Sequence, residues 1–185
     1  MAGKNSIDYF KNTFLKNGIA KPSRYEIEIF NDAIDNDVIS FQPETVQLPA
    51  RAFVQVEDNL FFGPVRRQPI GRDFTGQVVF TFPVSDTQGE RAFFEAWMDK
   101  IVHPTTQQAR YLQGSSFQTY GSMVIKTLNN SGDVSSTFKF EECYPATVMP
   151  VSLGYGMRDD YTRLTVAMEF RQYTFMSNDY ETGYF

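Results

Sequence analysis

The 185-residue chain has one cysteine, Cys143, and one histidine, His103. A single thiol forms no internal disulfide, which excludes a cysteine-rich secreted scaffold. One thiol and one imidazole supply too few ligands for a zinc finger or zinc ribbon, and the HExxH pattern needs two histidines. No stretch approaches the ~20 apolar residues that cross a bilayer, and the opening MAGKNSIDYF lacks the apolar core of a secretory signal. We therefore expect a soluble protein with no metal, no cofactor and no membrane partner, which is made in a reducing cytoplasm or is indifferent to redox state.

Positive charge is also scarce, because 17 lysines and arginines face 22 aspartates and glutamates, for a net charge of −5. A sequence-specific nucleic-acid-binding protein needs a cationic surface to release counterions from the phosphates. Sequence-specific DNA binding is therefore disfavoured.

Aromatic residues are abundant instead, at 16% of the chain, with 18 phenylalanines and 10 tyrosines. Such side chains favour strands, cores and protein interfaces. At this length one domain is expected, and it buries roughly 70% of the surface of its unfolded chain.

Hydrophobic periodicity predicts the elements of this domain. An alternating pattern is clearest at Val78, Phe80 and Phe82, and a helical stripe runs from Phe93 to Ile101. The fold class is mainly β, an antiparallel β-sandwich or barrel-like domain with one flanking α-helix and a short N-terminal helix. The expected helices are 6–17 and a second helix from a capping box at Thr87–Glu90 to His103-Pro104, and the expected strands are 24–30, 38–48, 73–84, 120–128, 134–144 and 161–175.

The whole chain, 1–185, is read as a single domain with three special segments. These are an N-terminal helix and arm (1–22), a long loop or hairpin between subunits (49–72) and a C-terminal tail (176–185). The extended stretch bracketed by Pro145 and Pro150 is expected to lie at a sheet edge or to carry a bulge, because proline donates no ladder hydrogen bond.

The search for catalytic groups finds no convergent set, and we expect no enzyme. His103 has no motif neighbour, and we interpret it as a helix-end residue that satisfies the last carbonyls. Cys143 follows two glutamates, which discourage a thiolate. Glu141 and Glu142 are adjacent in a strand and so point to opposite faces, which prevents a carboxylate dyad. No phosphate-binding or nucleophile-elbow motif is present.

The segment 49–71 favours assembly, since it is long for a loop in a compact domain and rich in aromatics and arginines. The alternative is a hairpin that folds onto its own sheet. The aromatic C-terminus is a second candidate contact. The proposed subunit and ring interface residues are Phe53, Phe61, Phe62, Arg66, Arg67, Arg72, Tyr180 and Phe185.

Several motifs in a fixed order resemble the tail tube proteins of contractile-tailed bacteriophages, which are related in fold to the tubes of contractile injection systems and type VI secretion. The resemblance covers about residues 6–175. The motifs are AKPSRY (20–25), VQLPA (46–50), RQPIGRDF (67–74), FEAW (94–97) and YPATV (144–148), followed by the closing strand 161–175.

This resemblance implies hexameric rings that stack into the inner tube of a contractile tail, a conduit for DNA ejection. Strands of neighbouring subunits would join into one continuous barrel, and the 49–74 loop would reach the adjacent ring. The implied partners are other copies of the chain, the tail sheath protein, the baseplate tube-initiator and tail terminator proteins, and the tape measure protein and DNA in the lumen. The implied location is the virion tail, assembled in the host cytoplasm.

The net negative charge suggests a lumen that does not retain DNA, because lysines and arginines would bind its phosphates. The candidate lumen-lining carboxylates are Glu141, Asp159, Asp160 and Glu169. Two other functions stay open: a baseplate tube-initiator of the same fold, and a monomeric β-sandwich binding module, for instance for a saccharide.

Overall fold

Strands dominate the computed structural model, which describes residues 7, 19–31, 39–58, 63–74, 76–109, 120–151, 153–154 and 161–177. The predicted helix 6–17, apart from Ile7, and the tail beyond Ser177 lie outside these residues. The elements are β1 (Tyr25–Phe30), β2 (Ile39–Phe41), β3 (Thr45–Gln47), β4 (Ala52–Asp58), β5 (Arg66–Asp73), β6 (Val78–Pro83), α2 (Gly89–Ile101), β7 (Gly121–Leu128), β8 (Val134–Val148), β9 (Arg163–Glu169) and β10 (Gln172–Ser177).

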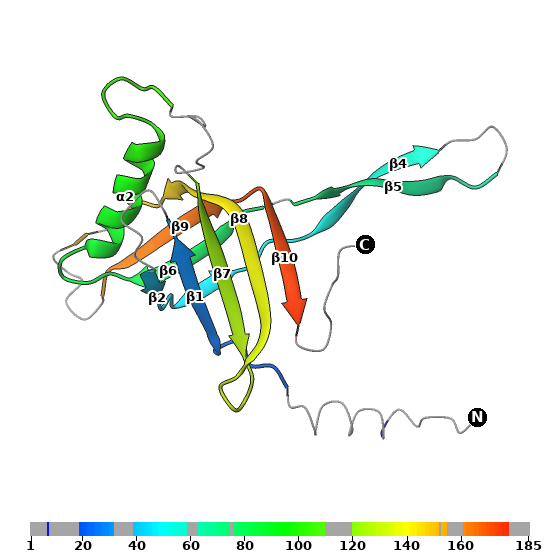
Figure 1. Cartoon of the computed structure of the whole chain (residues 1–185), viewed down its shortest axis with the longest axis horizontal. Helices are drawn as coiled ribbons and strands as arrows, with labels where there is room; N and C mark the ends of the chain where they lie inside the picture. The colour runs from blue at the N-terminus through cyan, green and yellow to red at the C-terminus, as the bar shows by residue number, and fades with distance from the viewer. Residues whose placement is uncertain are drawn as a thin grey trace.

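Two antiparallel layers share the long strand β8. The front layer has the order β2-β1-β7-β8-β10, and the back layer has the order β8-β9-β6-β3. Strands of the two layers cross in Figure 1, as in orthogonally packed sheets, whose corners are strands that pass from one sheet to the other at a bulge. β8 passes between the layers beside Glu142, which has a positive φ of 53°.

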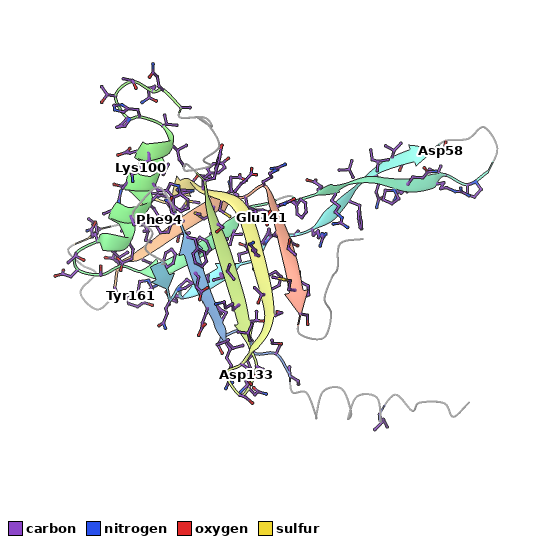
Figure 2. The ribbon with its side chains drawn as sticks, viewed as in Figure 1. Asp58, Phe94, Lys100, Asp133, Glu141 and Tyr161 are labelled. Carbon is purple, nitrogen blue, oxygen red and sulfur yellow. The ribbon has the colours of Figure 1, made fainter. Side chains whose placement is uncertain are left out.

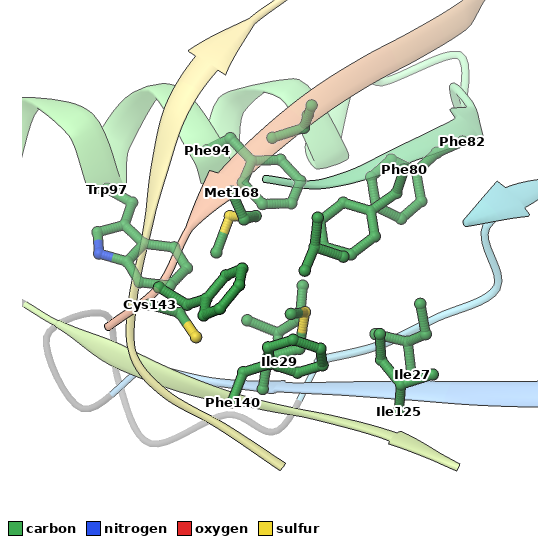
Figure 3. Close-up of a cluster of buried hydrophobic side chains, with 14 of the residues drawn as sticks. Ile27, Ile29, Phe80, Phe82, Phe94, Trp97, Ile125, Phe140, Cys143 and Met168 are labelled. Atoms are coloured by element: carbon green, nitrogen blue, oxygen red, sulfur yellow. The ribbon is translucent and has the colours of Figure 1, made fainter. Parts of the chain in front are cut away.

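The core lies between the layers and is closed at one end by α2 (Figure 3). Alternating residues supply it, such as Ile27 and Ile29 from β1 and Phe80 and Phe82 from β6. The predicted helical stripe is confirmed, since Phe94 and Trp97 are fully buried and Phe93 and Ile101 pack against the core. Each buried side chain of this size stabilises the fold by roughly 1.5–3 kcal/mol.

Two predicted strands are each divided into two. The predicted strand 38–48 was wrong, because β2 pairs with β1 in the front layer and β3 pairs with β6 in the back layer. Pro43 lies between them and offers no amide to either ladder. The predicted strand 161–175 likewise divides into β9 and β10, and the Arg171 amide donates to the Glu141 carbonyl (3.1 Å) at the turn between layers.

The start of α2 also differs from the predicted capping box. Gln88, not Thr87, is the N-cap residue, and it has a positive φ of 52° and no side-chain cap hydrogen bond. The Glu90 carboxylate instead accepts hydrogen bonds from the amide (3.1 Å) and hydroxyl (2.8 Å) of Ser85. The predicted hairpin of β7 and β8 is confirmed, as is the bulge at Pro145, where the β8–β9 register shifts.

Gly121 tests the contact between α2 and the front layer. A Cβ at this position would overlap the carbonyl oxygen of Phe30 and lie 2.8 Å from Cη2 of the buried Trp97. We expect Gly121→Ala to lower the free energy of unfolding by about 1–3 kcal/mol, measured by urea denaturation, because neither neighbour can yield easily.

Gly89→Ala is the matched control, because its new Cβ would lie 3.7 Å from the Thr87 hydroxyl, an ordinary contact in the first helical turn. This control should be neutral or stabilising by up to about 1 kcal/mol. Equal unfolding midpoints for the two variants would contradict the packing described here.

Candidate assembly surfaces

The segment 49–71 forms most of an arm of two strands, β4 and β5, that extends away from both layers (Figures 1 and 2). Its strands pair from Ala52↔Asp73 at the root to Asp58↔Arg66 near the tip, with a register shift between Val54 and Gln55. Phe53 on this arm is 62% exposed. The arm therefore does not fold back over its own sheet.

The two faces of the arm differ in chemistry. Strand alternation places Phe53, Arg72 and the ion pair Arg67–Glu57 (3.0 Å) on one face. The other face carries Val54 and Val56, both exposed. An exposed ion pair contributes at most about 1 kcal/mol, so it helps set the register more than it stabilises the arm. Exposed apolar side chains beside arginines are typical of protein interfaces.

The root of the arm is fixed by a cluster that sequence reasoning missed. The Arg51 guanidinium lies 5.6 Å from the Phe74 ring centroid and 5.8 Å from that of Tyr173 on β10. Phe74 and Tyr173 meet edge to face at 5.5 Å, and Tyr173 packs on Phe140 of the core at 5.3 Å. The sequence did offer one signal for this cluster. Arg51 directly precedes the first strand of the hairpin and Phe74 directly follows the second, so the two residues lie side by side at its root.

The predicted interface residues separate into two groups. Phe53, Arg66, Arg67 and Arg72 all lie on the arm. The other predicted interface residues, Phe61, Phe62, Tyr180 and Phe185, fall outside the described ranges, as do two of the four predicted lumen residues, Asp159 and Asp160.

The outer face of the front layer is polar and carries charges of both signs. Lys126 Nζ lies 2.6 Å from Oε1 of Glu28, and both side chains are about three-quarters buried. Lys139 Nζ lies 3.8 Å from Oε1 of Glu141, whose other oxygen accepts a hydrogen bond from Gln172 Nε2 (2.6 Å). Each of these lysines therefore has a carboxylate beside it.

The outer face of the back layer has its own polar contacts. Glu169 accepts a hydrogen bond from Gln77 Nε2 (2.8 Å), and the hydroxyls of Thr81 and Thr165 lie 3.2 Å apart. Glu169 and Glu141 are thus on opposite outer faces of the sandwich. A channel wall made of one layer would contain only one of these two predicted lumen residues.

The groups considered for catalysis have structural surroundings. Cys143 is fully buried, and this burial raises its thiol pKa to about 12. His103 Nδ1 accepts the amides of Thr105 and Thr106 (both 3.3 Å), so it holds a turn after α2 and not the helix carbonyls. Glu142 pairs with Arg171. Within the described ranges, no three His, Cys, Asp or Glu side chains gather to hold a metal ion.

The contacts of Arg51 with Phe74 and Tyr173 at the root of the arm lead to a test of how the arm is held. We expect Arg51→Ala to increase the rate of chymotrypsin cleavage after Phe53, because the variant loses contacts with two rings. Each contact is worth about 0.5–1 kcal/mol, so the unfolding midpoint of the whole domain should change little. Arg66→Ala near the tip is the control, and equal cleavage of both variants would contradict an anchoring role for Arg51.

Comparisons with known proteins bear on these surfaces. A family described as phage tail tube protein matches residues 14–176 of this chain. No curated protein matches in sequence. The fold is similar to a chain of the anti-feeding prophage baseplate (10% identity, TM-score 0.66), with coverage of 86% of this chain and 96% of that one. It is also similar to a chain of the sheath–tube complex of the PVC extracellular contractile injection system (10% identity, TM-score 0.64), with coverage of 94% and 99%.

A chain of the tube-terminating cap of the anti-feeding prophage is similar as well, at 13% identity and a TM-score of 0.62, over 89% of this chain and 99% of that one. At such identities these structures establish the fold. The match to the family covers most of the sequence, from before β1 to within β10. The chain therefore belongs to the phage tail tube protein family, whose members are structural components of a tube.

Proposed function

We propose that this protein assembles into hexameric rings that stack into the inner tube of a contractile phage tail. The observation that carries this proposal is the arm, which exposes Phe53, Val54 and Val56 to solvent in the single subunit. An extended hairpin with such a surface gains free energy by docking on a second copy in the adjacent ring. Membership of the tail tube family supports the same conclusion.

Ring closure through the front layer is favoured by one of its two edge strands, β10, while the opposite edge strand, β2, has three residues. β10 is a six-residue edge strand without proline. The back layer ends in the three-residue β3 and in the part of β8 that contains Pro145, and short or proline-bearing edges resist strand addition. We propose that the front layers of six copies form a closed barrel and that their outer faces line the lumen.

Such a wall would let DNA slide. Its charged residues in the described structure are Glu26, Glu28, Glu141, Lys126 and Lys139, a net charge of −1 per copy, and both lysines lie beside carboxylates. Phosphates of a passing duplex would therefore meet few available cations. This proposal assigns the lumen to Glu141 and not to Glu169.

The other assignments follow from the tube. We propose that the sheath protein surrounds it, that a baseplate initiator and a tail terminator bind its ends, and that tape measure protein and DNA occupy the lumen. Assembly would take place in the host cytoplasm. A baseplate initiator of the same fold is the second candidate, favoured by the likeness to a baseplate chain. A monomeric binding module is disfavoured because Trp97, the one tryptophan, is fully buried.

Phe53→Ala tests the arm directly. We expect the variant to fold normally, because Phe53 is mostly exposed in the subunit. Its critical concentration for tube formation should rise at least about tenfold, as expected when an interface anchor worth ~1.4 kcal/mol or more is lost. Light scattering and negative-stain microscopy measure this. Val102→Ala, on an exposed residue beyond α2, should polymerise like the wild type.

Glu141→Lys and Glu169→Lys test the lumen assignment as a pair. In particles carrying the substituted tube, Glu141→Lys should slow genome release, because the front face then changes from −1 to +1 per copy. The effect should weaken with added salt. Glu169→Lys should release DNA at the wild-type rate. A slowdown confined to Glu169→Lys would instead place the back layer at the lumen.

A further inference from the structure

The short strand β2 covers part of the edge of β1, a strand of the same length as β10. β1 has six residues, and β2 pairs with three of them, in the register Ile27↔Phe41, Glu28↔Ser40 and Ile29↔Ile39. β10, at the opposite edge of the front layer, also has six residues. β2 therefore pairs with half of β1, whereas a six-residue strand such as β10 could pair with all of it.

Strand direction shows why β2 conflicts with ring closure. Every pairing in the front layer is antiparallel, so β2, β7 and β10 run one way while β1 and β8 run the other. Rotation about a ring axis leaves the sense of each strand along that axis unchanged. A junction between β10 of one copy and β2 of the next would thus be parallel, whereas a junction between β10 and β1 would be antiparallel.

We propose that β2 is a removable cover and that the edge of β1 beneath it is the docking site for β10 of a second copy. This rests on the proposed ring assembly. Keeping β2 in place would limit the junction to a three-residue parallel ladder, which is the less stable kind per residue. Displacing β2 exchanges a three-residue ladder within the chain for an antiparallel ladder of up to six residues between copies.

The side-chain pattern is compatible with this junction. Ile27 and Ile29 on β1 face the core, as do Tyr173 and Phe175 on β10, which pack against Phe138. The intervening Glu26 and Glu28 on β1 share the outer face with Gln172 and Thr174 on β10. A β10–β1 junction in matching register therefore continues both the apolar inner face and the polar outer face across copies.

The chain after β2 is held independently of β2. The Glu44 amide donates to the Thr81 carbonyl of β6 (2.7 Å), and β3 follows directly in the back layer. Tyr25 Oη donates to the Pro43 carbonyl (2.7 Å). Residues 39–41 can therefore leave β1 by a rotation near Gln42 while the back layer stays intact.

A reversible cross-link tests this exchange. Glu28→Cys with Ser40→Cys places two thiols at partner positions of β1 and β2, and the native Cys143 is buried away from them. We expect the oxidised variant to lose ring and tube formation in negative-stain images and to remain monomeric by light scattering. The same protein after reduction should form tubes, which shows that the substitutions themselves permit folding.

Thr81→Cys with Thr165→Cys is the matched control, because these partners join β6 and β9 within the back layer. Its oxidised form should assemble like its reduced form. Tubes built from the fully oxidised Glu28→Cys/Ser40→Cys protein would overturn the proposal. A wild-type chain that forms no rings would instead contradict the proposed tube function itself.

Hydrogen exchange gives a second readout on the unmodified chain. Upon assembly, amides of residues 172–177 should gain protection, and those of residues 39–41 should lose it. Retained protection at residues 39–41 in the tube would also overturn the displacement of β2.

Discussion

The passage of β8 through both layers is the constraint on which the rest of the structure depends. Its first part pairs with β7 and β10, and its last part pairs with β9. Because β8 changes layer at Glu142, this one strand borders the core in both layers. It also places β10 on the far side of β8 from β7, as the six-residue edge strand of the front layer.

The arm and this edge are physically connected. Tyr173 belongs to β10, packs on the core ring of Phe140 and meets both Arg51 and Phe74 at the root of the arm. The proposed contact along the tube axis through the arm and the proposed lateral contact through β10 would thus share one aromatic cluster. In the proposed tube, docking through one of these surfaces would hold the other in a defined position, which suits growth by stacked rings.

The sequence predicted the features that follow from hydrophobic alternation. Val78, Phe80 and Phe82 were assigned to one buried face because residues two apart in a strand share a face, and all three are buried. The arm was predicted from the aromatic and arginine content of 49–71. The tail tube family was identified from short motifs in a fixed order, and the match over residues 14–176 confirms it.

Features that depend on tertiary pairing were not predictable. The alternation of 38–48 looks the same whether it forms one strand or two, and only the separate partners β1 and β6 divide it at Pro43. The positive φ at Glu142 carries no sequence signal, since glutamate has no preference for that conformation. Arg51 was missed because its ring partners include Tyr173, more than 100 positions away in the sequence. The assignment of Glu141 to the outer face of the front layer and of Glu169 to that of the back layer required the full strand order.

Cryo-electron microscopy of the purified, concentrated protein tests the central claim most directly. The account predicts stacked six-fold rings in which each arm contacts the neighbouring ring and the front layers form one continuous sheet around the bore. A population of single subunits whose arms contact no other copy would contradict it.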